Sequence, residues 1–316
     1  MSEKTKIPYA DHSWSPWQGC SEWAKPTSDR SPGCAHCYAE SLANRFGRSM
    51  KPTFTRDWRA PERWNREPWV CDTCGASYAE KPFACCGTSE FHRARVFVSL
   101  CDWLDPEVPI EWLARFLDLV CRTPNLDWLL LSKNLDQWRR RMRGVALLFS
   151  KQVISMSNPL NWLYSWAGGV VPHNVWVGTT VEDQAHSNRV CDLLKIPAKV
   201  RWLSLEPLLG PIELYGHWGM KPDWVVVGGE SGPKARPCNV DWIREIVRQC
   251  KSAAVPVFVK QLGSFCVTDE ASPDGWPPGT ELIQGCPEER LVKLKHSKGS
   301  DPAEWPADLR VREFPT

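Results

Sequence analysis

Short apolar runs, most of them rich in β-branched or aromatic residues, alternate along this chain with stretches of helical periodicity. The runs predict six strands, at residues 95–99, 128–132, 175–179, 201–205, 224–228 and 257–260. Helical patterns lie between them over 110–121, 184–194 and 241–251, and Asn239 or Asp241 is the expected N-cap of the third helix. Continuous apolar strands that alternate with amphipathic helices indicate βα units around a parallel sheet.

A weaker strand pattern over residues 13–17 and a helix pattern over 38–46 add one more unit at the N-terminus. Six or seven βα units predict an α/β fold, a partial or full (βα) TIM-like barrel. The 316 residues suffice for one large domain or two ordinary ones. We assign 1–265 to the barrel, 68–93 to a Cys-rich insertion within it, and 266–316 to a C-terminal extension that packs on the barrel.

Polar residues cluster where the predicted strands end. In (βα) barrels the chemistry lies at the carboxyl ends of the strands. Strand ends are also polar simply because loops face water. Glycines next to charged residues favour a ligand site, because they allow close backbone approach. We therefore expect a shared catalytic mouth that contains Ser99, Asp102, Ser132, Lys133, Asn134, Thr179, Glu182, Glu206, Gly228, Gly229, Glu230 and Lys260.

Three cysteines lie near the N-terminus, Cys20, Cys34 and Cys37, the last two within the sequence CAHCYA. They follow the first predicted strand and precede the first predicted helix. A [4Fe–4S] cluster normally has four thiolate ligands. Three thiolates leave one iron open, which is typical of enzymes that bind S-adenosylmethionine at that iron. A zinc site whose fourth ligand lies elsewhere fits the spacing equally well.

A second cysteine set comprises Cys71, Cys74, Cys85 and Cys86, with His92 beyond it. A Cys-x-x-Cys pair followed by further thiols is typical of a small zinc ribbon. Adjacent cysteines chelate one ion awkwardly, which makes His92 the alternative ligand. A second iron–sulfur cluster and free thiols are the remaining interpretations.

Cysteine usage and hydropathy indicate the compartment. No segment approaches the ~20 apolar residues of a membrane span, and the N-terminus lacks the apolar region of a signal peptide. We expect no membrane association and a cytoplasmic location. Thiols stay reduced there, so 14 cysteines favour metal ligation over disulfides.

The net charge of +2 gives no overall attraction to nucleic acid. Locally, arginines alternate with tryptophans over residues 58–66, and four arginines lie within 139–143. Such segments can stack bases and bind phosphates, although most of the 19 tryptophans also fit core packing. Phosphate-binding, dinucleotide-binding, hydrolase-elbow and zinc-protease motifs are missing, so nucleotide hydrolysis, dehydrogenation and common hydrolysis lack support.

The chain resembles a phage-associated family of radical S-adenosylmethionine proteins that was long described as phage proteins of unknown function. The matching segments run from end to end: 14–20, 31–40, 129–133, 175–182, 201–211, 223–233, 257–263 and 304–313. Two features differ from the family pattern. An insertion over 22–30 widens the Cys20–Cys34 spacing, and the block 70–92 resembles an insertion present in only part of the family.

The resemblance implies a radical S-adenosylmethionine barrel whose cluster ligands are Cys20, Cys34 and Cys37. A role in binding the cofactor is expected for His36, against the adenine unless it faces solvent, and for Glu230, which would accept the methionine ammonium. Arg236 would pair with a carboxylate or phosphate. Further cofactor-binding candidates are Tyr38, Ser99, Thr179, Glu182, Gly228 and Gly229; catalytic candidates are Lys133, Glu206 and Lys260.

Some relatives look like isomerases that rearrange a glycinyl-type amino-acid adduct on thymine during hypermodification of phage DNA. The expected substrate is therefore a modified DNA base or nucleotide, which must be flipped out or single-stranded. A reducing partner such as flavodoxin and a zinc ion complete the expected set. A radical lyase that repairs DNA lesions and a non-catalytic, zinc-dependent nucleic-acid-binding protein are the alternatives.

Overall fold

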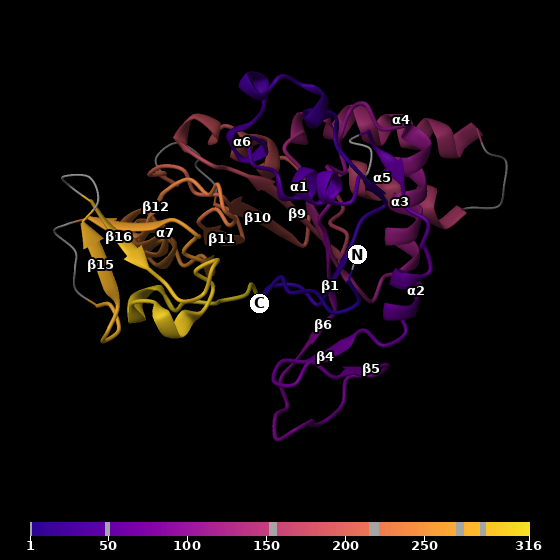
Figure 1. Cartoon of the computed structure of the whole chain (residues 1–316). Helices are drawn as coiled ribbons and strands as arrows, with labels where there is room; N and C mark the ends of the chain where they lie inside the picture. The colour runs from indigo at the N-terminus through magenta and orange to yellow at the C-terminus, as the bar shows by residue number, and fades with distance from the viewer. Residues whose placement is uncertain (1, 48–50, 152–156, 215–220, 270–274, 285–288) are drawn as a thin grey trace. The chain divides into compact units, whose positions relative to one another are not determined.

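The computed structural model describes residues 2–47, 51–151, 157–214, 221–269, 275–284 and 289–316. Its main sheet has seven strands in the order β1-β7-β8-β9-β10-β11-β13. Figure 1 labels β1, β9, β10 and β11 of this sheet. All six strong strand predictions are confirmed to within one residue. The bounds are β1 His12–Trp14, β7 Arg95–Val98, β8 Asp127–Leu131, β9 Val175–Thr180, β10 Val200–Leu205, β11 Trp224–Gly228 and β13 Val257–Gln261.

The described pairings in this sheet are parallel. Val96 of β7 lies opposite Trp128 of β8, and Val225 of β11 lies opposite Val257 of β13. Strands β1 and β13 stand at the two ends of the order. The α/β class is therefore confirmed, and the strand order is that of a partial barrel rather than a full one.

The helices come between the strands, as the periodicity predicts. Asn239 is the N-cap of the helix that follows β12, and its side chain accepts a hydrogen bond of 2.9 Å from the Asp241 N–H. Three helices have no counterpart in the sequence prediction: α2 Ala60–Trp64, α4 Trp138–Lys151 and α5 Ser157–Ala167. Those confirmed are α1 Tyr38–Arg45, α3 Ile110–Arg122, α6 Arg189–Leu194 after a 3-10 turn η5 Gln184–His186, and α7 Val240–Ser252.

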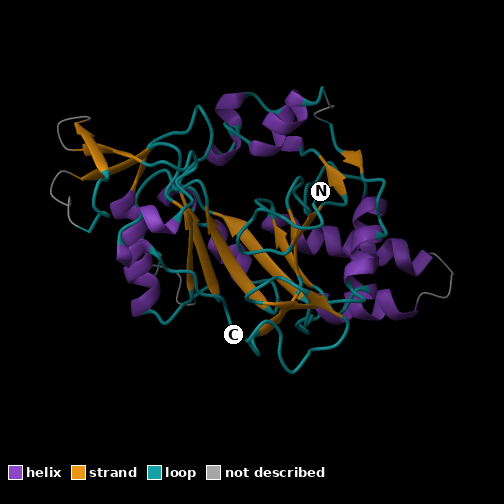
Figure 2. Cartoon of the chain, turned by 60° about the horizontal axis from the view of Figure 1, so that its bottom comes forward, coloured by secondary structure: helices purple, strands orange, loops and turns teal. Residues whose placement is uncertain are grey.

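Three smaller sheets and several 3-10 turns complete the structure (Figure 2). The Cys-rich insertion is a three-stranded antiparallel sheet of β4 Trp69–Cys71, β5 Ser77–Tyr78 and β6 Phe91–Arg93. The others are β2 Trp17–Gln18 with β3 Thr53–Phe54, and β12 Cys238–Asn239 with β14 Cys266–Asp269, β15 Glu281–Gln284 and β16 Glu289–Lys293. The turns are η1 Ser21–Ala24, η2 Thr27–Asp29, η3 Pro32–Cys34, η4 Leu135–Gln137, η6 Pro302–Glu304 and η7 Ala307–Leu309.

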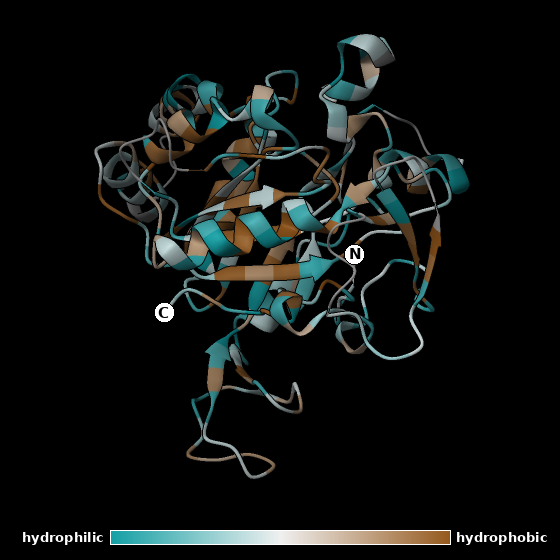
Figure 3. Ribbon diagram, turned by 90° about the vertical axis from the view of Figure 1, so that its left-hand side faces the viewer, coloured by the Kyte–Doolittle hydropathy of each residue, from teal (hydrophilic) through white to brown (hydrophobic). Residues whose placement is uncertain are grey.

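The chain forms two compact units. Unit 1 contains residues 1–178 and 196–199, and unit 2 contains 179–195 and 200–316. Tryptophans are buried in both, such as Trp14 against Trp128 in unit 1 and Trp224 against Phe258 in unit 2. Apolar residues concentrate on the strands, as the brown segments of Figure 3 show.

The end of the chain returns to β13. The Val259 N–H donates to the Val311 carbonyl, and the Glu313 N–H donates to the Val257 carbonyl. The extension therefore adds backbone hydrogen bonds along β13. Within the described residues, no helix has the length and hydropathy needed to cross a membrane.

Candidate metal centre and cysteine loop

Four cysteine sulfurs of the insertion converge within 4.8 Å of one another. The Sγ atoms of Cys71 and Cys86 are 3.6 Å apart, and those of Cys74 and Cys85 are 3.5 Å apart. Tetrahedral zinc with Zn–S bonds of about 2.3 Å requires sulfur–sulfur distances of about 3.8 Å. The four cysteines can therefore hold a metal ion, and an all-thiolate set suits zinc.

Tight turns bring these sulfurs together. The Gly75 N–H donates to the Cys71 carbonyl, which folds the Cys-x-x-Cys segment back on itself. Cys85 and Thr88 exchange two backbone hydrogen bonds of 2.8 Å around Cys86 and Gly87, whose φ angles are +40° and +85°. This two-residue turn aims both adjacent thiols at the same point. The expected difficulty of chelation by neighbouring cysteines is thereby removed.

His92, the expected alternative ligand, lies outside the four-sulfur group. Its ring contacts Asp72 through Nδ1 and Asp11 through Nε2, the latter at 2.9 Å. Asp11 also accepts the Arg95 N–H. Burial pushes the pKa of Asp11 upward, but His92 and Arg95 outweigh it and leave that pKa lowered. His92 therefore joins the insertion to the start of the main sheet.

The thiols of the four-cysteine group differ in proton affinity. The backbone N–H of Cys74 lowers the pKa of Cys71 to about 7, whereas contact with Cys74 raises that of Cys86 to about 12. The Tyr78 hydroxyl donates to the Cys85 sulfur at 2.9 Å. Metal binding would displace the remaining protons, as thiolate coordination requires.

The other three cysteines lie in one loop of unit 1, between the first strands and α1. Cys37 is the N-cap of α1, and its side chain makes no capping hydrogen bond. Cys34 is buried at the end of η3, while Cys20 precedes η1 and is half-buried. The thiolates of a four-iron cluster bind different corners of a cube, so they lie farther apart than the ligands of one ion. Among the described residues, these three cysteines do not belong to the group whose sulfurs converge within 4.8 Å.

Two buried carboxylates flank Cys20. Asp105 accepts a 2.6 Å hydrogen bond from the Ser21 N–H. Burial, and next the charges of Asp102 and Asp105, raise the pKa of Cys20. Neither the fold nor the spacing of residues indicated Asp105 in advance.

Asp102 organises the strand ends around this loop. It accepts hydrogen bonds from Ser132 Oγ at 2.5 Å, from the Lys133 N–H at 2.9 Å and from Asn134 Nδ2 at 2.8 Å. Burial raises the pKa of Asp102 although these donors oppose the shift. The structure thus joins the ends of β7 and β8, as the strand-end pattern predicts. The charge of Lys133 also contributes to the lowered pKa of Glu22 in η1.

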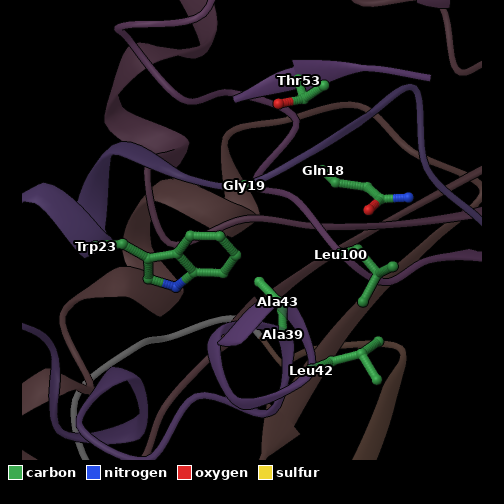
Figure 4. Close-up of a pocket in the computed structure, with 8 residues that line it drawn as sticks. All are labelled: Gln18, Gly19, Trp23, Ala39, Leu42, Ala43, Thr53 and Leu100. Carbon is green, nitrogen blue, oxygen red and sulfur yellow. The ribbon is translucent and has the colours of Figure 1, made fainter. Parts of the chain in front are cut away.

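A cavity of about 250 Å³ adjoins the cysteine loop. Figure 4 shows Trp23, Leu42 and Leu100 around it. Gly19 and Ala39 also line it, next to Cys20 and close to Cys37 in sequence. The walls are mostly apolar, so the cavity suits a poorly hydrated group.

In unit 2 the predicted strand-end charges pair with one another. Lys260 Nζ lies 2.8 Å from Glu206 Oε1. Glu182 is fully buried and accepts a 2.8 Å hydrogen bond from Arg189, a residue that the sequence analysis did not single out. These ion pairs hold the ends of β9, β10 and β13 in place.

Glu230, expected to accept the methionine ammonium, and Arg236, expected to pair with a carboxylate or phosphate, bind each other. Arg236 donates to Glu230 from Nε at 3.0 Å, from Nη2 at 2.7 Å and from its backbone N–H at 2.8 Å. This bidentate geometry is the strongest that the two side chains can form. A ligand would have to compete with it.

Gly228 and Gly229 serve close packing of the chain with itself. A Cβ at Gly229 would lie 2.4 Å from the Leu262 carbonyl oxygen and 2.8 Å from Cys238 Cβ. At Gly228 it would lie 2.9 Å from the Gln261 carbonyl oxygen. The backbone at the end of β13 and just after it therefore makes the close approach that the two glycines allow.

We predict that Gly229→Ala lowers the free energy of unfolding by about 3 kcal/mol, because backbone cannot move away as a flexible side chain would. The matched control is Gly210→Ala, where an added Cβ meets nothing within 4 Å. Urea unfolding of both variants measures the difference. Equal stability of the two would contradict the packing role.

The other predicted cofactor residues occupy varied environments. His36 and Tyr38 are exposed, which agrees with the solvent-facing alternative for His36. Ser99 is half-buried just after β7. Thr179 is fully buried in β9, and its hydroxyl has no hydrogen-bond partner among the described residues.

The tryptophans of residues 58–66 are packing residues rather than base-stacking ones. Trp64 is buried and stacks on His12 at 4.1 Å, and Trp58 stacks on Phe54 at 4.9 Å. Arginines near them remain at the surface: Arg56, Arg59, Arg63 and Arg66.

Fold and sites together define an α/β protein with a partial-barrel parallel sheet and a four-cysteine group that could hold a metal ion. The chain belongs to the family described as "Protein of unknown function (DUF5131)", whose model matches residues 4–303. Comparison with curated proteins and with solved structures gives no match.

Proposed function

We propose that this chain is a radical S-adenosylmethionine enzyme in which Cys20, Cys34 and Cys37 hold a [4Fe–4S] cluster. The observation that carries the proposal is the placement of all three thiols in one loop, after β1 and directly before α1. Parallel βα proteins carry out chemistry at this edge of the sheet.

The donor set fits such a cluster. Iron–sulfur clusters take thiolate ligands, and Cys37 lies at the N-cap of α1. A cluster held by Cys20, Cys34 and Cys37 would supply the one-electron reduction of S-adenosylmethionine to methionine and a 5′-deoxyadenosyl radical, with the electron drawn from a flavodoxin-type reductant. The chain's own contribution is to orient and shield: a mostly apolar cavity lies beside the loop, and Asp102 fixes the backbone of Lys133.

The test is iron and sulfide analysis of protein purified and reconstituted without oxygen. We expect about four irons and four sulfides per chain, and release of 5′-deoxyadenosine from S-adenosylmethionine after reduction. A colourless, iron-free protein after reconstitution would instead favour a non-catalytic zinc protein.

For the substrate we propose a modified thymine in DNA, rearranged to an isomer with the abstracted hydrogen returned. Support comes from the family resemblance and from the exposed arginines on and around α2, which suit phosphate contacts. Mass spectrometry of nucleosides from DNA treated with the reduced enzyme tests it. An isomer of unchanged mass supports the isomerase, whereas restored thymine would identify a repair lyase.

We predict that the double variant Arg59→Ala/Arg66→Ala weakens DNA binding and lowers the salt-dependence slope by about one for each lost phosphate contact. The control is Arg248→Ala, an exposed arginine of α7 that pairs with Glu245. Filter binding at several salt concentrations measures both. Unchanged affinity and slope in the double variant would exclude this surface.

A further inference from the structure

One arginine of the run 139–143 differs from its neighbours. Arg139, Arg140 and Arg143 are exposed on α4, but Arg141 is only 6% exposed. A long cationic side chain is rarely buried without a partner. Its environment therefore requires a physical explanation.

The buried guanidinium lacks hydrogen bonds along one edge. Arg141 Nε and Nη2 are both buried without a partner among the described residues. These two N–H groups point in parallel and match two oxygens of a carboxylate or phosphate. A buried charged donor without a hydrogen-bond partner costs free energy, because no acceptor replaces the water that it has lost.

The charged groups that face Arg141 attract it but are used elsewhere. Burial lowers the pKa of Arg141, and the charge of Arg140 lowers it further. The carboxylates of Asp105 and Asp102 act in the opposite direction and raise that pKa. Asp105 already accepts the N–H groups of Ser21 and Glu107. Asp102 has four donors of its own. The carboxylates thus hold the positive charge in place without occupying its free edge.

A second unused donor lies in the same region. Trp138, one turn before Arg141 in α4, packs against Trp103 with ring centroids 6.0 Å apart. Trp103, which lies between Asp102 and Asp105 in the sequence, is fully buried. Its Nε1 has no hydrogen-bond partner among the described residues. Loop 101–105 and α4 therefore pack against each other, and each carries a buried donor without a partner among the described residues.

We propose that Arg141 binds an oxyanion, a carboxylate or phosphate group, at its Nε–Nη2 edge beside the loop 101–105. The site adjoins the cysteine loop, because Asp105 binds the Ser21 N–H. Carboxylate would come from an amino acid and phosphate from a nucleotide. Binding at this edge does not require iron, so its test is independent of the proposed function.

The experiment titrates inorganic phosphate, and separately acetate, into the full-length protein at constant ionic strength, with calorimetry and the thermal midpoint as readouts. We expect saturable binding of at least one probe to the wild type. Arg141→Met should weaken it about tenfold or more, equal to about 1.4 kcal/mol. Arg140→Met, an exposed neighbour on the same helix, should bind as the wild type does.

Preference for phosphate or for acetate supports the site and identifies the source of the oxyanion. Absence of saturable binding of both probes to the wild type overturns the proposal, as does wild-type affinity in Arg141→Met. If Arg141→Met does not fold, Arg141→Lys decides. This variant keeps the charge but loses the planar edge, so about tenfold weaker binding supports the site and unchanged binding overturns it.

Discussion

Replacement of Cys37 by alanine is expected to abolish iron binding at the cysteine loop. The variant should fall from about four irons per chain to near none, because two thiolates cannot hold a cluster that normally has three or four. Cleavage of S-adenosylmethionine should disappear with the iron. The fold should survive, since the Cys37 side chain makes no capping hydrogen bond to α1.

Cys191→Ala is the matched control, because Cys191 is an exposed free cysteine on α6. It should keep iron and activity. Cys20→Ala extends the test to the cysteine whose spacing differs from the family pattern. Persistence of cofactor cleavage in reduced Cys37→Ala would disprove the ligand assignment.

Substitution of Cys74 by serine is the second change with a large expected effect. Structural zinc contributes about 10–16 kcal/mol of apparent binding free energy in small zinc domains. Removal of one of the four thiolates should weaken metal binding by more than the 10–100-fold that is typical for loss of an outer-shell partner. We expect loss of the metal to a mild chelator and protease cleavage within residues 72–90, measured by metal analysis and mass spectrometry.

His92→Gln is the control that separates the two ligand hypotheses. His92 contacts Asp11 and Asp72 rather than the four sulfurs, so this variant should keep its metal. Retention of metal by Cys74→Ser together with its loss from His92→Gln would restore the histidine as a ligand.

Much of the fold was predictable because its signals are local. A buried parallel strand needs a continuous apolar run, and β8, β9 and β11 each present one. Helix α4 escaped prediction because its arginine-rich surface hides the apolar positions Trp138, Met142 and Val145 that pack inward. Its buried face becomes evident only against α3 and α5.

The sequence predicted which residues lie at the candidate site better than it predicted which side chains they contact. Their positions at strand ends identified Glu206, Glu230 and Lys260 as candidates. The side chain that pairs with such a residue can lie far away in the sequence, as with Lys260 and Glu206, which are 54 residues apart. Arg236 and Glu230 each looked suited to a ligand, and only their bidentate contact showed that they bind each other. Such pairing depends on how the loops after neighbouring strands meet, which spacing does not encode.

By itself the sequence determined the α/β class, the order of the strands and the two separate cysteine groups. These follow from apolar periodicity and from cysteine spacing, which act over a few residues. The tertiary structure alone decided which four sulfurs converge, that His92 is not among them, and that Arg141 is buried with an unused edge. Those features depend on turns with positive φ and on packing between distant segments, where small changes of backbone direction select the neighbours of each side chain.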